Sequence, residues 1–266
     1  MSLYEVGLYL LLLLAGAFAG FINTLTGSGS VVTIAALIFA GLPANIANGT
    51  NRLGVMVQTS VGMLTFARHG RAHVKGSEWF IIPAVIGGML GAWVATQTSG
   101  QVFERWLGFV MVLMLFIILY KPQKWLRQHS QAEQQRTLLN LLVFFGVGFY
   151  GGFIQAGIGI FLMIALVLLA KFNLQETTIL KLSVVFFINI PSLLIFIYYG
   201  QVEWVYGSIM AIGQSIGANL AARFALKSQQ AALWTYRLLV AVVLLSIWEL
   251  FDLGEYTLKI FTLVLT

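Results

Sequence analysis

Hydroxyl and amide side chains gather around two glycine pairs that interrupt long apolar stretches of the chain. The first group consists of Asn23, Thr24, Thr26, Gly27, Ser28, Gly29 and Ser30. The second is poorer in side-chain donors and consists of Gln155, Gly157 and Gly159. A helix broken at glycine in an apolar medium exposes backbone N–H groups and a positive dipole end, and both attract anions. Both groups are therefore candidate anion sites, although glycine and serine also allow close helix packing in membranes.

Two cations stand at the edges of apolar stretches, where charge is unexpected. Arg52 follows Asn51 and begins the third stretch, and Lys181 begins the matching stretch of the second half. A cation at the centre of a bilayer costs at least about 2.5–3.5 kcal/mol, so such residues usually face a cavity or a partner. We expect Asn51, Arg52 and Lys181 to contribute polar groups and charge to an anion site. The alternative is that both cations reach the membrane interface and anchor helix ends.

The remaining polar residues do not indicate catalysis. Seven of them lie at comparable depths in the two halves, where they either line a path or hydrogen-bond between helices: Asn48, Thr50, Gln58, Asn189, Ser192, Gln214 and Asn219. His69 and His73 are four residues apart, but no third ligand stands at a recognised spacing, so we expect no metal site. The acidic residues stand at the ends of apolar stretches, and there is no nucleotide-binding motif. We therefore expect neither an enzyme nor a cofactor.

Composition places these residues in a membrane. Hydrophobic residues make up 59% of the 266 positions, charged residues only 9%, and the mean hydropathy is +0.91. A soluble domain carries roughly 25% charged residues, so this chain cannot cover itself with polar surface. The net charge of +6 comes from Lys and Arg in short loops, and we interpret it as a topology signal rather than a nucleic-acid site. The absence of cysteine excludes disulfides and thiolate chemistry.

Ten apolar stretches can position the candidate residues. They cover residues 6–26, 30–42, 52–67, 78–96, 103–120, 138–156, 158–170, 179–199, 205–222 and 231–250. Most approach the 20 or so residues that a helix needs to cross a bilayer, but the second and seventh are too short. Each short stretch follows a longer one across a glycine pair, so each pair is predicted to form a broken helical hairpin. Irregular backbone at membrane depth must be buried in protein or line a cavity.

The chain is predicted to be a duplication. At an offset of 130 residues Gly16, Gly27 and Gly29 meet Gly146, Gly157 and Gly159, and the Phe66–Gly70 turn meets Phe196–Gly200. With five elements in each half the second half is inverted, which places most basic residues of both halves on the cytoplasmic side and both termini outside. A parallel arrangement of four plus four helices would leave the basic residues of the second half outside. Inverted repeats with matching helix breaks are a pointer to a secondary transporter with a midplane site.

The fold expected from these patterns is an all-α polytopic membrane protein made of two inverted five-element repeats. The first repeat covers residues 1–122, a cytoplasmic linker 123–137, and the second repeat 138–266. Each repeat opens with a glycine-broken hairpin. The expected partners are a small anionic substrate and the lipid bilayer. Glycine-rich faces allow a homodimer without requiring one.

The ordered motifs resemble the TauE/SafE family of sulfite and organosulfonate permeases. The likeness rests on Gly20–Gly29, on Leu42–Arg52, on the Gly70 turn and on the degenerate second copy around Gly157–Gly159, and it covers essentially the whole chain. It implies export, or less often uptake, of sulfite, sulfonates or related sulfur anions across a prokaryotic inner membrane. The second repeat departs from the pattern, because Thr178–Lys181 replaces the Gly-Thr-Asn-Arg run.

Alternative functions remain at this point. An anion channel shares every feature of a carrier, and an uptake permease for another small organic anion fits as well. A membrane enzyme would need acids, histidines or a metal converging inside the bilayer. A structural subunit would not require two halves with matching helix breaks.

Overall fold

The computed structural model describes residues 2–70, 78–103, 105–106, 109, 137–170, 172, 174–227 and 237. Within these residues the chain forms helices and turns, and no β-strand. The long helices are α1 (Leu3–Thr26), α3 (Ala44–Arg68), α4 (Glu78–Thr96), α6 (Leu138–Phe153), α8 (Leu174–Tyr198) and α9 (Trp204–Lys227). The short ones are α2 (Ser30–Phe39), α7 (Ile158–Ile164) and the π-helical η2 (Ala165–Leu169), which continues α7. The described part of the chain is therefore all-α, as the apolar stretches predict.

The distribution of side chains is that of a membrane protein. Among the described helices α1, α4, α8 and α9 are long and apolar enough to cross a bilayer. Large apolar side chains such as Leu14, Ile82 and Leu220 are more than half exposed, whereas Asn, Gln and Thr side chains are concentrated in the interior. Lipid favours this arrangement because the bilayer core holds no water to satisfy polar groups. The protein is a polytopic membrane protein.

Two helices begin earlier than the sequence predicts. We expected the third and eighth elements to begin near residues 52 and 179, with Arg52 and Lys181 at their ends. Instead α3 begins at Ala44 and α8 at Leu174, so both cations lie about two turns inside their helices. The prediction for α3 was wrong because polar residues such as Asn48 lower the local hydropathy, although in the folded chain Asn48 is fully buried against other helices.

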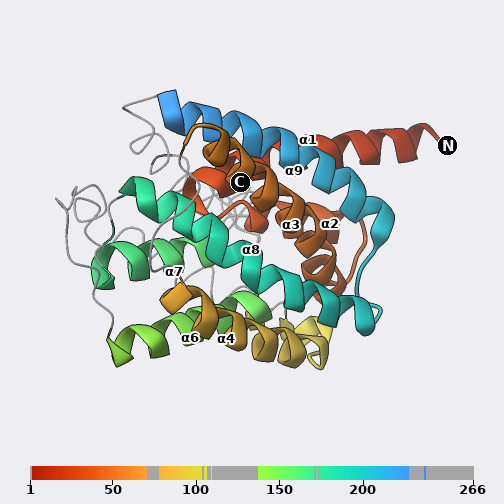
Figure 1. Cartoon of the computed structure of the whole chain (residues 1–266). Helices are drawn as coiled ribbons and strands as arrows, with labels where there is room; N and C mark the ends of the chain where they lie inside the picture. Colours follow the sequence, from red (N-terminus) through yellow and green to blue (C-terminus); the bar gives the residue numbers. More distant parts are fainter. Residues whose placement is uncertain are drawn as a thin grey trace, which may run out of the picture.

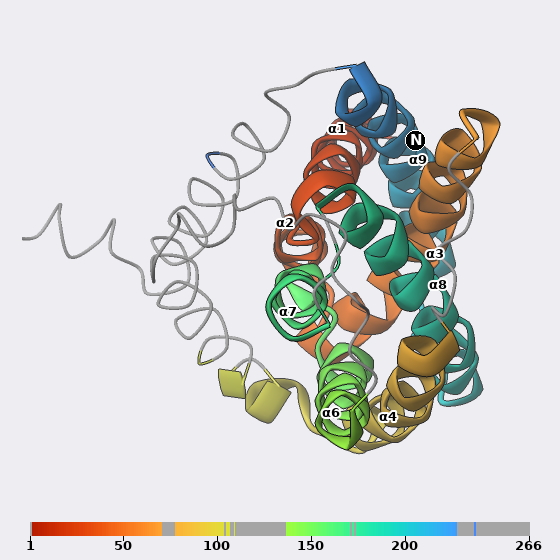
Figure 2. The same ribbon diagram turned by 60° about the vertical axis from the view of Figure 1, so that its left-hand side comes forward.

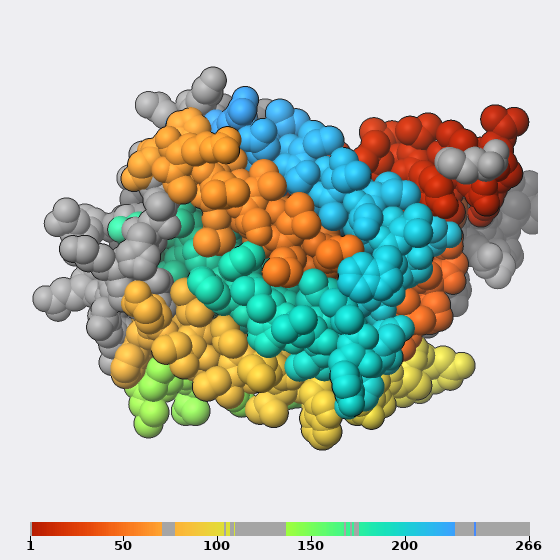
Figure 3. All heavy atoms as spheres, turned by 45° about the vertical axis from the view of Figure 1, so that its right-hand side comes forward, coloured from red at the N-terminus to blue at the C-terminus, as the bar shows by residue number. Residues whose placement is uncertain are grey.

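The long helices lie side by side in the order α1, α9, α3, α8, α4 and α6 (Figures 1 and 2). In Figure 3, α3 in orange lies between α9 in blue and α8 in teal, with α4 in gold beyond α8. The short α2 contacts α1 and α3, and the short α7 contacts α6 and α8. The fourth element of each predicted half therefore packs with the other half, since α4 contacts α6 and α8 while α9 contacts α1 and α3.

Two helix pairs approach each other closely at glycines spaced four residues apart. In the pair of α1 and α9 these are Gly16, Gly20, Gly213 and Gly217, and in the pair of α4 and α6 they are Gly87, Gly91, Gly148 and Gly152. A Cβ atom added at any of these eight positions would lie within 2.8 Å of a backbone oxygen of the partner helix. This small-residue spacing lets backbones touch and drives helix association in lipid. Each pair is thus joined backbone to backbone.

Several sequence predictions lie outside the described residues. They include most of the fifth stretch (103–120), nearly all of the tenth (231–250), nearly all of the linker 123–137, and His73. The glycine breaks do lie within the described residues. Gly27 ends α1 and Gly157 precedes α7, both in the left-handed region, with φ of 81° and 70°.

Candidate functional site

The two broken hairpins meet at the centre of the protein. The backbone N–H of Gly159 donates to the carbonyl oxygen of Gly27 at 3.1 Å. A Cβ atom on Gly27 would lie 2.2 Å from the Cα of Gly159, and a Cβ atom on Gly159 would lie 2.1 Å from the Cα of Gly27. Side chains are therefore excluded at this contact, and the two glycine pairs singled out in the sequence form one junction.

Lys181 closes the end of the first broken helix. Its side chain comes from α8, is 1% exposed, and donates from Nζ to the carbonyl oxygens of Thr24 at 3.1 Å and Leu25 at 3.0 Å. Both carbonyls belong to the last turn of α1, where a helix leaves its C=O groups without intrahelical partners and carries a partial negative charge. The buried ammonium thus compensates the carbonyl end of α1.

Arg52 does the same for the second broken helix. Its side chain comes from α3, is fully buried, and donates from one terminal nitrogen to the carbonyl oxygens of Gly151, at 3.3 Å, and Gly152. Its guanidinium carbon lies 4.6 Å from the ring centroid of Phe196, in a cation–π contact. Gly151 and Gly152 belong to the last turn of α6. Both cations are buried between helices and bonded to carbonyl groups, whereas a side chain that reaches a membrane interface would be exposed.

The two contacts follow one rule. In each predicted half, a cationic side chain of the third helix binds the carbonyl end of the broken first helix in the other half. Lys181 of α8 binds the end of α1, and Arg52 of α3 binds the end of α6. Residues more than 90 positions apart in sequence are joined in both cases. Neither charge is matched by a buried carboxylate in the described part of the chain.

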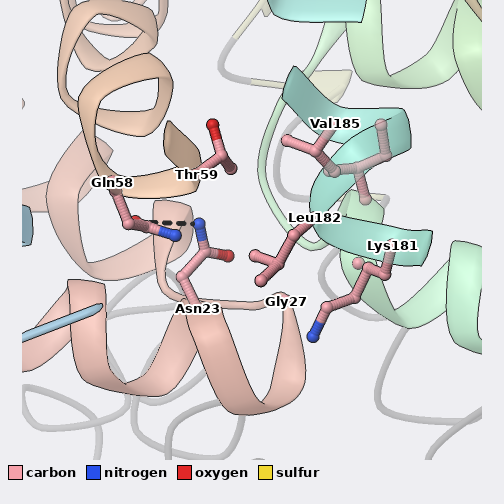
Figure 4. Close-up of a pocket in the computed structure, with 9 residues that line it drawn as sticks. Asn23, Gly27, Gln58, Thr59, Lys181, Leu182 and Val185 are labelled. Atoms are coloured by element: carbon pink, nitrogen blue, oxygen red, sulfur yellow. Dashed lines mark hydrogen bonds between the residues drawn. The ribbon is translucent and has the colours of Figure 1, made fainter. Parts of the chain in front are cut away.

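A small pocket with a few polar side chains in its lining lies beside this junction (Figure 4). Lys181, Leu182 and Val185 of α8 line one side, and Asn23, Gln58 and Thr59 face them. Gly27, Ile158 and Gly159 complete the lining. The free space accommodates little more than a water molecule, so the pocket is nearly closed in this conformation.

One buried donor in the pocket lining has no hydrogen-bond partner among the described residues. Asn23 donates from Nδ2 to Oε1 of Gln58 at 3.2 Å, which leaves Nε2 of Gln58 buried and without a partner within the described residues. Lys181 adds a positive charge with its Nζ at the end of α1. An unpaired buried N–H group costs about 1–3 kcal/mol, so this pocket favours an acceptor, above all a negatively charged one.

Asn51 and Gln155 lie in a separate amide network. Asn51 donates to Gln155 at 3.3 Å, Gln155 donates to Asn189 at 2.9 Å, and Asn189 donates to the carbonyl oxygen of Arg52 at 2.6 Å. Asn48 extends the network, since its side chain accepts from the Gln155 N–H at 3.3 Å and donates to the Phe153 carbonyl at 3.0 Å. These bonds hold the irregular backbone between α6 and α7 against α3.

The hydroxyl groups around the first break mainly hold the backbone. Thr26 donates to the carbonyl oxygen of Ile22 at 3.0 Å and accepts from the Ser28 N–H at 3.2 Å, and the two hydroxyls lie 2.6 Å apart. Gly29 packs against the carbonyl oxygen of Ala19, and Ser30 begins α2. The Thr24 hydroxyl is buried without a partner among the described residues, but it is not part of the pocket lining.

The structure therefore divides the candidate residues into groups. Asn23, Gly27, Gly159 and Lys181 line the pocket, whereas its lining does not include Thr24, Thr26, Ser28, Gly29, Ser30, Asn51, Arg52, Gln155 or Gly157. Substrate binding by any of these residues stays a prediction. Thr59 and Leu182 also line the pocket but were not singled out in the sequence. The only signal near them was the adjacent residue in each case, Gln58 and Lys181. The described residues contain no group of three His, Asp or Glu that could hold a metal ion.

Comparison with known proteins relates this geometry to a family. The model of the sulfite exporter TauE/SafE family matches residues 12–248. A probable membrane transporter protein of Sinorhizobium, ORF9, is 31% identical over 81% of this chain and 82% of its own length. The probable membrane transporter protein YfcA of Escherichia coli is 30% identical over 91% of each chain, and one of Haemophilus influenzae is 31% identical over 82% of this chain and 86% of its own. No solved structure gives a significant match. The chain belongs to the TauE/SafE family.

Proposed function

We propose that this membrane transporter carries a small sulfur-containing anion, sulfite or an organosulfonate, out of the cell across a prokaryotic inner membrane. Family membership and the transporter names of the relatives support transport. The main support for an anionic substrate is the pocket between the broken hairpins, because its lining includes the cationic Lys181 and Gln58 with its unpartnered amide nitrogen. The described residues bury no carboxylate that would repel an anion.

The proposed architecture is two inverted five-element repeats, with the fifth and tenth elements outside the described residues. Several features support it. In Figure 1, α3 and α8 run in opposite directions, as do α4 and α9. Gly27 and Gly157, and also Gly70 and Gly200, are left-handed at the common offset of 130 residues. The positive-inside rule then puts both termini on the outer side.

A carrier is favoured over a channel by the size of the pocket. Sulfite and sulfonates are larger than water, so the hairpins or α8 must move before the pocket can admit one. A site that opens to only one side at a time exchanges its ligand by alternating access, which is the behaviour expected of helices broken at the midplane. A channel would instead need a continuous path.

Counterflow in proteoliposomes tests the proposal. Proteoliposomes that contain the purified protein are loaded with unlabelled sulfite, thiosulfate, sulfoacetate or sulfate. Entry of the same anion in labelled form is then followed. We expect saturable exchange of at least one sulfur anion. No exchange by folded protein would refute the proposed function, and flux that never saturates would indicate a channel.

A charge substitution tests the pocket itself. Gln58→Glu keeps the shape of the side chain but places a carboxylate where the anion is proposed to bind. We expect its half-saturation concentration to rise at least tenfold, which corresponds to about 1.4 kcal/mol. The matched control is Gln97→Glu, because Gln97 is exposed and is not part of the pocket lining. Equal half-saturation concentrations in the two variants would remove the pocket from the transport path.

A further inference from the structure

The carbonyl ends of broken helices are strong cation sites in a membrane. The last turn of such a helix leaves C=O groups unpaired, and its dipole adds a partial negative charge. In secondary transporters these ends and the unwound carbonyls beside them coordinate the Na⁺ or H⁺ that is carried with the substrate. A transporter with two broken helices therefore has two places where a coupling cation is expected.

In this protein both places are occupied by the chain's own side chains. The Lys181 ammonium contacts two carbonyl oxygens at the end of α1, and the Arg52 guanidinium contacts two at the end of α6. Both side chains are almost completely buried, at 1% and 0% exposure. A metal cation brought to either end would meet a fixed like charge at contact distance, in a medium of low dielectric where such repulsion is strong.

We propose that Lys181 and Arg52 are built-in substitutes for coupling metal cations, so that the protein moves its anion without co-transport of Na⁺ or K⁺. The inference rests on the proposed function and adds its ion requirement. The two side chains belong to α8 and α3, so the charges that compensate the helix ends are never released to the solution. A bound Na⁺ would instead have to arrive and leave with each substrate.

Ion replacement is the direct test. Counterflow of the transported anion is measured with Na⁺ and K⁺ on both sides of the membrane, and again with N-methyl-D-glucamine as the only cation, at equal ionic strength. We expect rate and half-saturation concentration to agree within twofold. A tenfold loss in N-methyl-D-glucamine that is restored by Na⁺ or K⁺ overturns the inference and leaves the proposed function intact.

Thermal unfolding gives a readout that does not need transport. The unfolding midpoint of the wild type in detergent should be the same in NaCl and in N-methyl-D-glucamine chloride. Lys181→Ala, which vacates the end of α1, should be stabilised by several degrees in NaCl relative to N-methyl-D-glucamine chloride. A saturable, Na⁺-specific stabilisation of the wild type overturns the inference, and so does a folded Lys181→Ala protein that responds no more than the wild type. If no anion exchanges in any salt, the proposed function fails and the unfolding comparison still decides whether Lys181 occupies a cation site.

Discussion

Gly159 offers the sharpest test of the central junction. In the substitution Gly159→Ala the new Cβ would lie 2.1 Å from the Cα of Gly27, and ordinary contact begins at 3.4 Å, so the hairpins must separate by about 1.3 Å. The 3.1 Å hydrogen bond from the Gly159 N–H to the Gly27 carbonyl cannot survive that shift. Overpacking costs about 1–3 kcal/mol and an unpaired buried amide about 1–3 kcal/mol. Alanine regains about 1 kcal/mol because it favours the helix more than glycine does.

The expected result is a net loss of about 1–5 kcal/mol. It should be visible as a fall of several degrees in the unfolding midpoint, which is followed by tryptophan fluorescence in detergent. Counterflow should fall as well, because Gly27 and Gly159 both line the pocket. Gly146→Ala is the matched control, since Gly146 is also helical in the second half but has nothing within 4 Å of its added Cβ. The reasoning is refuted if Gly159→Ala unfolds at the same temperature as Gly146→Ala and transports equally well.

Three further substitutions follow from the contacts described. Arg52→Lys retains a charge for the end of α6 and should keep more than a tenth of wild-type counterflow. Arg52→Met should show no counterflow or fail to fold. Equal counterflow by the two variants would exclude a requirement for charge at this position. Gly20→Leu should separate α1 from α9 and lower the unfolding midpoint by several degrees, whereas Gly7→Leu, at an exposed position with free space, should not. Asn189→Leu removes two network hydrogen bonds worth about 0.6–2 kcal/mol each in membranes, and an unchanged midpoint would show that the network does not stabilise the fold.

The helix breaks can be predicted from the sequence, but the groups that bind the two buried cations cannot. Glycine pairs between apolar stretches predict the breaks at Gly27 and Gly157, because backbone conformation there is a local property. The partners of Lys181 and Arg52 are carbonyl groups about 100 or more residues away, and no residue type marks a carbonyl as a cation site. The start of α3 was misplaced for a related reason. The low hydropathy of Asn48 indicates a position outside an apolar helix. In the folded chain its hydrogen bonds to the second half allow it to be buried.

The polar residues of α3 illustrate the same limit. Gln58, Asn51 and Asn48 look similar in sequence: Asn51 is expected to contribute to an anion site, and either role, lining a path or bonding between helices, fits Asn48 and Gln58. In the folded chain Gln58 lines the pocket, while Asn51 and Asn48 are paired within the amide network. Which role each residue takes depends on what the second half of the chain presents to it.

The glycine contacts of α1 with α9 and of α4 with α6 have a mechanical consequence. Helices joined backbone to backbone are expected to move together, because any sliding would drive Cα atoms into carbonyl groups. Where α3 faces α8, its glycines meet side chains of that helix: Gly62 meets Leu182 and Gly49 meets Phe196. The one backbone group involved is the carbonyl oxygen of Gln201, which follows the end of α8 and lies against Gly49. We expect motion at that boundary, beside Lys181 and the pocket. The moving bodies would then be two mixed bundles, each assembled from helices of both predicted halves, and neither half could work as a separate piece.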